Sequence, residues 1–145
     1  MASYRFVGPD TATTGNTSQR LGAALDIGDL DGDGRVDLAI GAENDRGFGN
    51  GASLYIVGGA SLAAADAADG TIDRTIDLEA AVGTPGLYRI DTSDPDTDFG
   101  ASLALGDFDG DARRDLIVGA GFSDTGGTNA GTAYLFLGAE LEGLD

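Results

Sequence analysis

The sequence predicts an all-β fold in which two similar repeats form four-stranded antiparallel blades of a β-propeller. The stretch Asp29–Asp37 occurs again as Asp107–Asp115, and the residues that flank both copies alternate with the period of two expected of strands. Later strands, at 54–57 and 134–137, are apolar at every position, which indicates that both of their faces are covered. Stacked blades meet this need, whereas a two-sheet sandwich, the competing architecture, would expose one face of each strand.

Composition narrows the class of protein. The chain has 145 residues, of which 41% are hydrophobic, and its 25 glycines suit short strands joined by tight turns. The formal charge is −17, which makes nucleic acid and anionic membranes poor partners. Since the chain has no His and no Cys, an imidazole base and a thiol nucleophile are excluded. We find no membrane-spanning stretch and no targeting segment, and we expect the chain to be a piece of a longer protein.

The first repeat contains the elements of one blade. Residues 4–8 form a short strand, and a polar loop separates them from a strand at 21–29. The acidic stretch leads from this strand into the next, at 36–42, and a Gly- and Asn-rich turn leads into a third, at 52–57. Short loops between these three strands predict an antiparallel meander.

The segment 61–87 is less regular. Ser61 is a suitable N-cap for a helical turn that reaches Ala68, and residues 71–78 alternate weakly.

The pattern starts again at Tyr88, because Tyr88-Arg89-Ile90 echoes Tyr4-Arg5-Phe6. We therefore divide the chain into a first repeat at 1–87, with a long outer connection, and a second repeat at 88–145 that lacks its own outer strand. The matching stretches are 21–29 with 99–107, 37–42 with 115–120, and Gly51–Gly58 with Gly131–Gly138.

The repeated acidic stretch has the spacing of a calcium loop. Asp29, Asp31, Asp33 and Asp37 occupy positions 1, 3, 5 and 9, and the main-chain carbonyl of Arg35 is suited to position 7. Carboxylates this close repel one another, and a hard cation with about six to eight oxygen ligands relieves the repulsion. The equivalent ligands in the second copy are Asp107, Asp109, Asp111, Asp115 and the carbonyl of Arg113.

Two other interpretations of this stretch fit less well. An EF-hand would place a bidentate Glu at position 12 and a helix behind it, but position 12 is Ile40 or Val118 and the flanks are strand-like. An acidic turn without a metal would explain one copy but not two equivalent ones. The copies differ at position 6, where Gly34 is replaced by Ala112. A β-carbon at positive φ costs about 1 kcal/mol, so we expect the second site to bind more weakly.

The repeats resemble FG-GAP repeats, the blade units of integrin α-subunit β-propellers and of many bacterial surface and secreted proteins. Phe99-Gly100 stands where the family has FG, Gly106–Asp111 matches the start of its loop, and Asp115–Gly121 matches the strand that ends in GAP. The first repeat has Leu21-Gly22 and Gly41-Ala42-Glu43 at the two named ends.

The resemblance covers residues 21–58 and 99–138 well. It implies blades of the FG-GAP type, and it places the family's calcium ligands on the same ten residues.

Three functions follow as hypotheses. The first is a calcium-binding, non-enzymatic segment of an integrin-like adhesion or scaffold protein, extracellular or at the cell surface, in which calcium is structural. The second is the propeller portion of a secreted calcium-dependent polysaccharide lyase or other hydrolytic enzyme. Its best candidate pair, Tyr88-Arg89, is repeated as Tyr4-Arg5, so strand structure explains it better. The third is a dockerin-like or thrombospondin-type calcium array, which would place helices or successive loops beside the ion.

Partners are predicted only by class. A protein or glycan ligand would bind at loops 43–51 and 121–130, because loops commonly carry function. Two blades cannot close a ring, and the last blade lacks its fourth strand. We expect residues 4–8 of a neighbouring copy to complete that blade in a cyclic head-to-tail homo-oligomer of three or four chains, unless neighbouring blades of a parent protein do so.

Overall fold

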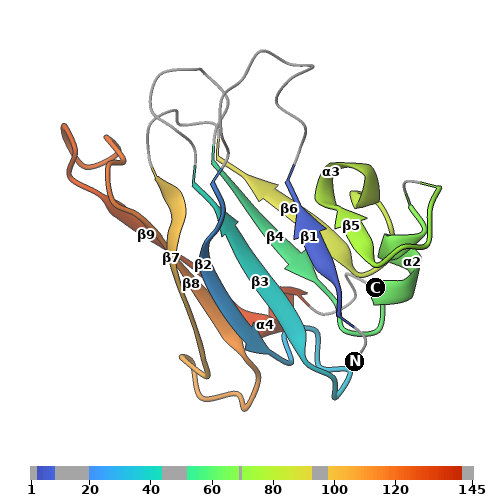
Figure 1. Cartoon of the computed structure of the whole chain (residues 1–145). Coiled ribbons are helices and arrows are strands. Elements are labelled where there is room, and N and C mark those ends of the chain that lie inside the picture. Colours follow the sequence, from blue (N-terminus) through green and yellow to red (C-terminus); the bar gives the residue numbers. More distant parts are fainter. Residues whose placement is uncertain (1–2, 9–19, 44–51, 69, 93–97, 142–145) are drawn as a thin grey trace.

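The computed structural model describes residues 3–8, 20–43, 52–68, 70–92 and 98–141. These residues form two antiparallel sheets that pack against each other, with a small layer of short elements on one side (Figure 1). The structure confirms the predicted all-β fold of blade-like sheets.

The first sheet has the strand order β2-β3-β4-β6. β2 (Leu21–Gly28), β3 (Asp37–Ala42) and β4 (Ser53–Val57) form the predicted meander. β6 (Leu87–Asp91) pairs with the far edge of β4, so the fourth strand of this sheet comes from the stretch at which the sequence pattern starts again.

The second sheet has the order β7-β8-β9 within the described residues. β7 (Phe99–Gly106), β8 (Asp115–Ala120) and β9 (Thr132–Phe136) repeat the meander, and the short helix α4 (Gly138–Leu141) follows. Both β2 and β7 carry a register irregularity just after their first residue.

The register corrects one part of the sequence comparison. Tyr55 pairs with Ile40 in the first sheet, and Tyr134 pairs with Val118 in the second. Ile40 and Val118 are equivalent, so Tyr55 and Tyr134 are equivalent too. The alignment of Gly51–Gly58 with Gly131–Gly138 was therefore wrong by one residue, because the double glycine after β4 allows two alignments.

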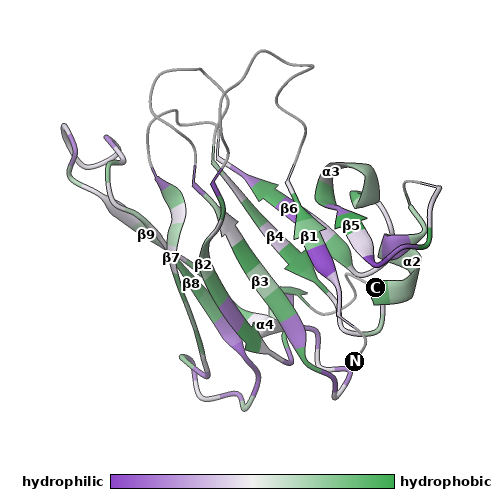
Figure 2. Ribbon diagram, viewed as in Figure 1, coloured by the Kyte–Doolittle hydropathy of each residue, from purple (hydrophilic) through white to green (hydrophobic). Residues whose placement is uncertain are grey.

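One face of each sheet contributes to a shared core. Leu54 and Ile56 of β4 lie there with Leu116 and Val118 of β8, all of them buried. Phe99 packs edge-on against Tyr134 in the same core, with ring centroids 5.4 Å apart. Figure 2 shows the apolar residues concentrated on the strands that meet here.

The opposite face of the first sheet is covered by four short elements, which we name the covering elements. They are α2 (Leu62–Asp66), β5 (Thr75–Asp77), α3 (Leu78–Ala81) and β1 (Arg5–Val7). Their buried side chains Ala65, Ile76, Leu78 and Ala81 form a second core with Ile40, Ala42, Tyr55, Val57 and Leu87 of the sheet. Because both faces are covered, every residue of β4 is buried, which explains its unbroken apolar run.

The covering elements agree only in part with the sequence expectations. The helical turn after Ser61 is confirmed as α2, and Ser61 is its N-cap, although its side chain makes no capping hydrogen bond. β5 lies inside the weakly alternating stretch. The parallel pairing of β1 with β5 was not predicted. This pairing places Phe6 of β1 against the second core, and burial of the Phe6 side chain holds β1 against its own chain.

Candidate metal centre

The two acidic loops join equivalent strands at the same end of the sheets, the lower end in Figure 1. One loop connects β2 to β3, and the other connects β7 to β8. The adjacent inner strands hold the two ends of each loop close together, so the carboxylates between them are confined to a small volume.

Backbone N–H groups fold the first loop around its own carboxylates. Asp29 accepts hydrogen bonds from the amides of Gly32 and Gly34, at 2.9 and 3.0 Å. Asp31 accepts from the amide of Asp33 at 3.0 Å, which is an Asx turn. Both glycines have positive φ, 83° and 84°, so the chain turns tightly.

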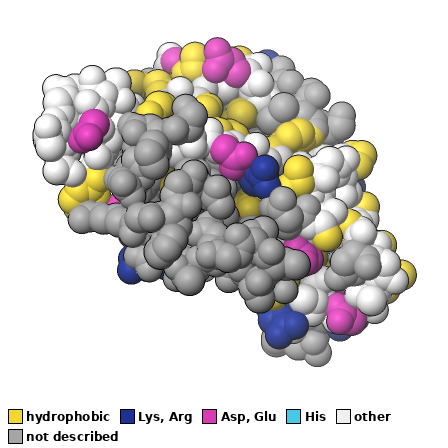
Figure 3. Space-filling view, turned by 90° about the horizontal axis from the view of Figure 1, so that it is seen from above, with side chains coloured by type: hydrophobic (Ala, Val, Ile, Leu, Met, Phe, Trp, Pro, Cys, Tyr) yellow, Lys and Arg dark blue, Asp and Glu magenta, His cyan; other side chains and the backbone are white. Residues whose placement is uncertain are grey.

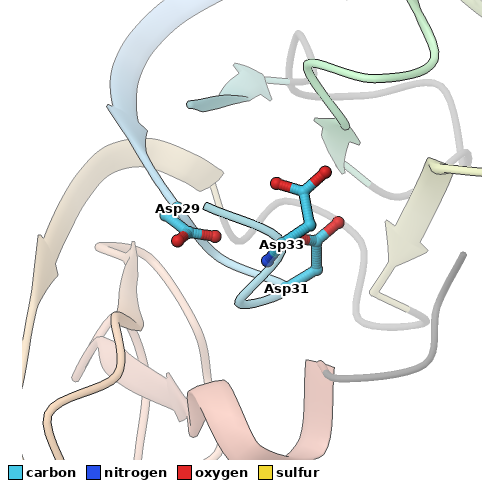
Figure 4. A group of neighbouring side chains, drawn as sticks. All are labelled: Asp29, Asp31 and Asp33. Carbon is cyan, nitrogen blue, oxygen red and sulfur yellow. The ribbon is translucent and has the colours of Figure 1, made fainter. Parts of the chain in front are cut away.

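The carboxylates of the first loop converge. One oxygen from each of Asp29, Asp31 and Asp33 lies within 4.8 Å of the others, and Figure 4 shows Asp31 and Asp33 pointing to the same side. An ion with Ca–O distances of about 2.3 to 2.6 Å can have ligands on opposite sides about 5 Å apart, so this group fits one calcium ion.

The second loop repeats this geometry. Asp107 accepts from the amides of Gly110 and Ala112, at 2.7 and 3.1 Å. Ala112 has φ 72°, which confirms that a β-carbon is held in the left-handed region. The carboxylates that converge here within 4.8 Å are those of Asp107, Asp109 and Asp115.

The last aspartate of each loop is buried and ties the loop to the third strand of its sheet. Asp37 is 2% exposed, and its two oxygens accept from the amides of Leu30, at 2.7 Å, and Gly59, at 3.0 Å. Asp115 is 1% exposed and accepts from the amides of Phe108, at 2.6 Å, and Gly138, at 2.9 Å.

The glycines at the ends of these third strands are required by close approach. A β-carbon at Gly59 would meet the backbone carbonyl of Val36, and one at Gly138 would meet that of Arg114. Sequence reasoning missed both residues as parts of the site. With the corrected register, the signal is a glycine at the same place in both repeats.

The two buried aspartates differ in acidity. Burial raises the pKa of the Asp37 carboxyl above its ordinary value, and the backbone donors of Gly59 and Leu30 offset this only in part. The backbone N–H groups of Gly138 and Phe108 hold the pKa of Asp115 below its ordinary value. Asp115 is therefore the better prepared of the two to carry a negative charge.

The predicted ligands do not all come together. Asp37 lies outside the first cluster and Asp111 outside the second. Asp111 accepts from the amide of Arg113 at 2.8 Å, and the guanidinium of Arg113 lies 4.0 Å from its other oxygen. Arg35 makes the same two contacts with Asp33, at 2.6 and 4.0 Å. The roles of the Arg35 and Arg113 carbonyls stay predictions.

A cleft of about 370 Å³ separates the two loops. It is lined by Asp29, Leu30, Gly32, Ala112, Arg113 and Arg114. At the other end of the molecule, on the face shown in Figure 3, the described acidic side chains lie apart from one another. Of the two loops predicted to bind a ligand, residues 44–51 lie outside the described residues, and 121–130 form turns around the buried Ser123.

Comparison with known proteins agrees with this geometry. The family model described as FG-GAP repeat matches the chain twice, at residues 21–57 and 99–136. The two matches end at Val57 and Phe136, which the strand register also makes equivalent. A search of curated proteins gives no match to the chain. Among the described residues, no helix has the length and apolar character needed to cross a membrane.

Proposed function

Because this chain belongs to the FG-GAP repeat family, we propose that it is a calcium-binding, non-enzymatic segment of a β-propeller in an adhesion or scaffold protein. The observation that carries this proposal is the pair of equivalent loops, each of which gathers three carboxylates within 4.8 Å. Oxygen-only ligands gathered on one short loop suit calcium, a hard cation.

Calcium would be structural at both sites. Each loop joins the first two strands of its sheet, and Asp37 or Asp115 extends the connection to the end of the third. An ion that neutralises the loop would remove the repulsion between carboxylates and so stabilise three strands together. Modules of this kind bind calcium at about 0.1 to 1 mM, which suits the extracellular or cell-surface location that we propose.

The proposed non-enzymatic role is supported by the surroundings of Tyr88-Arg89. Tyr88 packs against the shared core, and its hydroxyl accepts a hydrogen bond from the amide of Gly86 at 3.4 Å. Arg89 forms an ion pair with Asp91 at 3.0 Å. Both side chains thus have structural partners near their own strand, and adjacent strand residues point to opposite faces of the sheet.

Thermal unfolding with calcium and with a chelator tests the proposal. At tenfold excess over the dissociation constant, linkage adds about 1.4 kcal/mol per site. Asp33→Ala should lose the calcium-dependent stabilisation of one site. Asp111→Ala should lose less, because Asp111 lies outside its cluster and Ala112 is expected to weaken that site.

Asp73→Ala is the matched control. Asp73 accepts a hydrogen bond from the amide two residues ahead, at 2.8 Å, as Asp33 does at 2.6 Å, but it lies in neither cluster. This variant should keep the full response to calcium. A melting temperature that is the same with calcium and with chelator would contradict the proposal, as would an equal loss of response in the control.

A further inference from the structure

The contact between the two sheets shows how one blade binds to the next. The carbonyl of Gly100, at the irregularity in β7, lies against Gly41 of β3 where a β-carbon would have no room. Asp26 of β2 accepts a hydrogen bond from the amide of Leu105 at 2.8 Å, which links the two sheets directly. The repeats are equivalent, so each half of this contact has a counterpart elsewhere on the chain.

The outer face of the second sheet is the counterpart of the face on which β7 lies. Ala104 pairs with Ile117, and Ile117 pairs with Leu135, so three apolar side chains cross this face in one row. Leu135 is 41% exposed, and Ala104 is also exposed. Gly119 of β8 is the equivalent of Gly41.

β2, the edge strand of the first sheet, is the counterpart of β7. Leu25 and Ile27 of β2 are 60% and 63% exposed, although their equivalents Leu103 and Leu105 pack against the shared core. Gly22 has φ 86°, close to the 82° of Gly100. No atom of the described chain lies within 4 Å of the place that a β-carbon on Gly22 would take.

We propose that the outer face of the second sheet binds β2 of a second copy of this chain, in the way that the first sheet binds β7. Gly22 would lie on Gly119, and Leu25 and Ile27 would lie over the row of Ala104, Ile117 and Leu135. The contact is heterologous, because the two copies use different surfaces, and repeated contacts form a ring where the rotation from copy to copy closes and an open filament where it does not. It depends on the sheet faces alone and not on the metal.

Two polar groups at this contact, the amide of Ile27 and the carbonyl of Gly22, have partners available. Ala104 stands where the first sheet has Asp26, so the second sheet offers no carboxylate to the arriving strand. The amide that would need one, that of Ile27, already donates to Asp26 of its own chain at 2.9 Å. The hydroxyl of Ser102 lies over Gly119. After rotating aside it can donate a hydrogen bond to the arriving carbonyl of Gly22.

The covering elements leave room for this partner. They pack over β3, β4 and β6, whereas Leu25 and Ile27 stay exposed. Within the described residues β1 is paired with β5 alone, so its other edge can pair with β9 of the copy whose second sheet binds β2. β1 would then supply the fourth strand of a neighbour's second sheet.

Sedimentation equilibrium of the chain, at up to about 1 mM, tests the proposal. The wild type should be larger than a monomer. Ile27→Glu and Leu135→Glu should each be monomeric, because a charge on either surface opposes burial. Ile72→Glu is the matched control, since Ile72 is 82% exposed and lies on neither surface, and it should associate like the wild type.

Mixing the two monomeric variants gives the decisive result. Each keeps one intact surface, so an equimolar mixture should form a dimer that grows no further. A monomeric wild type would overturn the proposal, and so would association lost in Leu135→Glu alone, which would indicate a symmetric contact between two second sheets. Circular dichroism checks that each variant is folded. Calcium-dependent melting of the monomeric variants separates this outcome from failure of the proposed calcium role.

Discussion

Exchanging the residues at position 6 of the two loops should change stability in opposite directions. Ala112 is held at φ 72° and Gly34 at φ 84°. Holding a residue with a β-carbon at positive φ costs about 1 to 2 kcal/mol of folding free energy. Replacing it by Gly removes this cost but adds about 0.5 to 1 kcal/mol of its own, because Gly loses more conformational freedom when the chain folds. Ala112→Gly should therefore raise the free energy of unfolding by about 0.5 to 1 kcal/mol, and Gly34→Ala should lower it equally. A β-carbon at Gly34 would have no atom within 4 Å, so crowding adds nothing.

Urea unfolding of each variant, with calcium and with chelator, measures both changes. The corresponding shift in melting temperature is about 2 to 4 °C for 1 kcal/mol in a chain of this size. Gly110→Ala should behave like Gly34→Ala, because Gly110 has φ 83° and equally open surroundings. Ala101→Gly is the control, because Ala101 is an exposed strand residue without positive φ. It should destabilise the chain, since Gly there adds its entropic cost without relieving strain. A loss of stability in Ala112→Gly would refute the strain argument, and a gain seen only with calcium would show that strain arises on binding.

Two further predictions concern the buried aspartates and the glycines next to them. The first is measured in chelator. The stabilisation by the ionised Asp115 should be complete above its ordinary pKa of 3.8 and should be lost as the pH falls through its lowered pKa in the folded chain. Asp115→Asn should therefore flatten the acid side of a plot of unfolding free energy against pH. For Asp37 the sign is reversed, because folding raises its pKa. Its contribution to the free energy of unfolding is complete below pH 3.8 and is lost as the pH rises through the raised pKa. Asp37→Asn should remove this decrease in stability with rising pH. The same slope in both variants and the wild type would contradict these assignments. Gly59→Ala should cost about 1 to 3 kcal/mol by chemical denaturation, since its β-carbon meets backbone, whereas Gly106→Ala, with open surroundings, should change little.

The strands and loops could be predicted because their signals are local. Alternation around each loop identifies the inner strands, and Asp at alternate positions identifies the candidate ligands. The register of β4 against β9 could not be read in this way. Gly58-Gly59 offers two alignments to Gly138, and only pairing with Ile40 and Val118 selects one.

Other features depend on contacts between distant parts of the chain. The residues of 61–87 form elements of three to five residues, too short for a period to show, and their position follows from burying Ile76 and Leu78 on the first sheet. The absence of Asp37 from the first metal cluster could not be predicted either. Asp37 and Asp115 make equivalent bonds to Gly59 and Gly138, yet only Asp115 joins its cluster, and identical spacing within the two loops cannot indicate this difference.

The bond from Asp37 to Gly59 also sets an order of events in folding. Asp37 binds Leu30 across 7 residues of sequence, but it binds Gly59 across 22. The hairpin that carries the loop can close first, because short loops close fastest, whereas the loop is anchored only after β4 has paired. During synthesis, the chain must emerge beyond Gly59 before Asp37 has both of its backbone donors. Since Asp29, Asp31 and Asp33 all lie within this hairpin, calcium added in a refolding experiment should act once the hairpin has formed, before the bond to Gly59 is made.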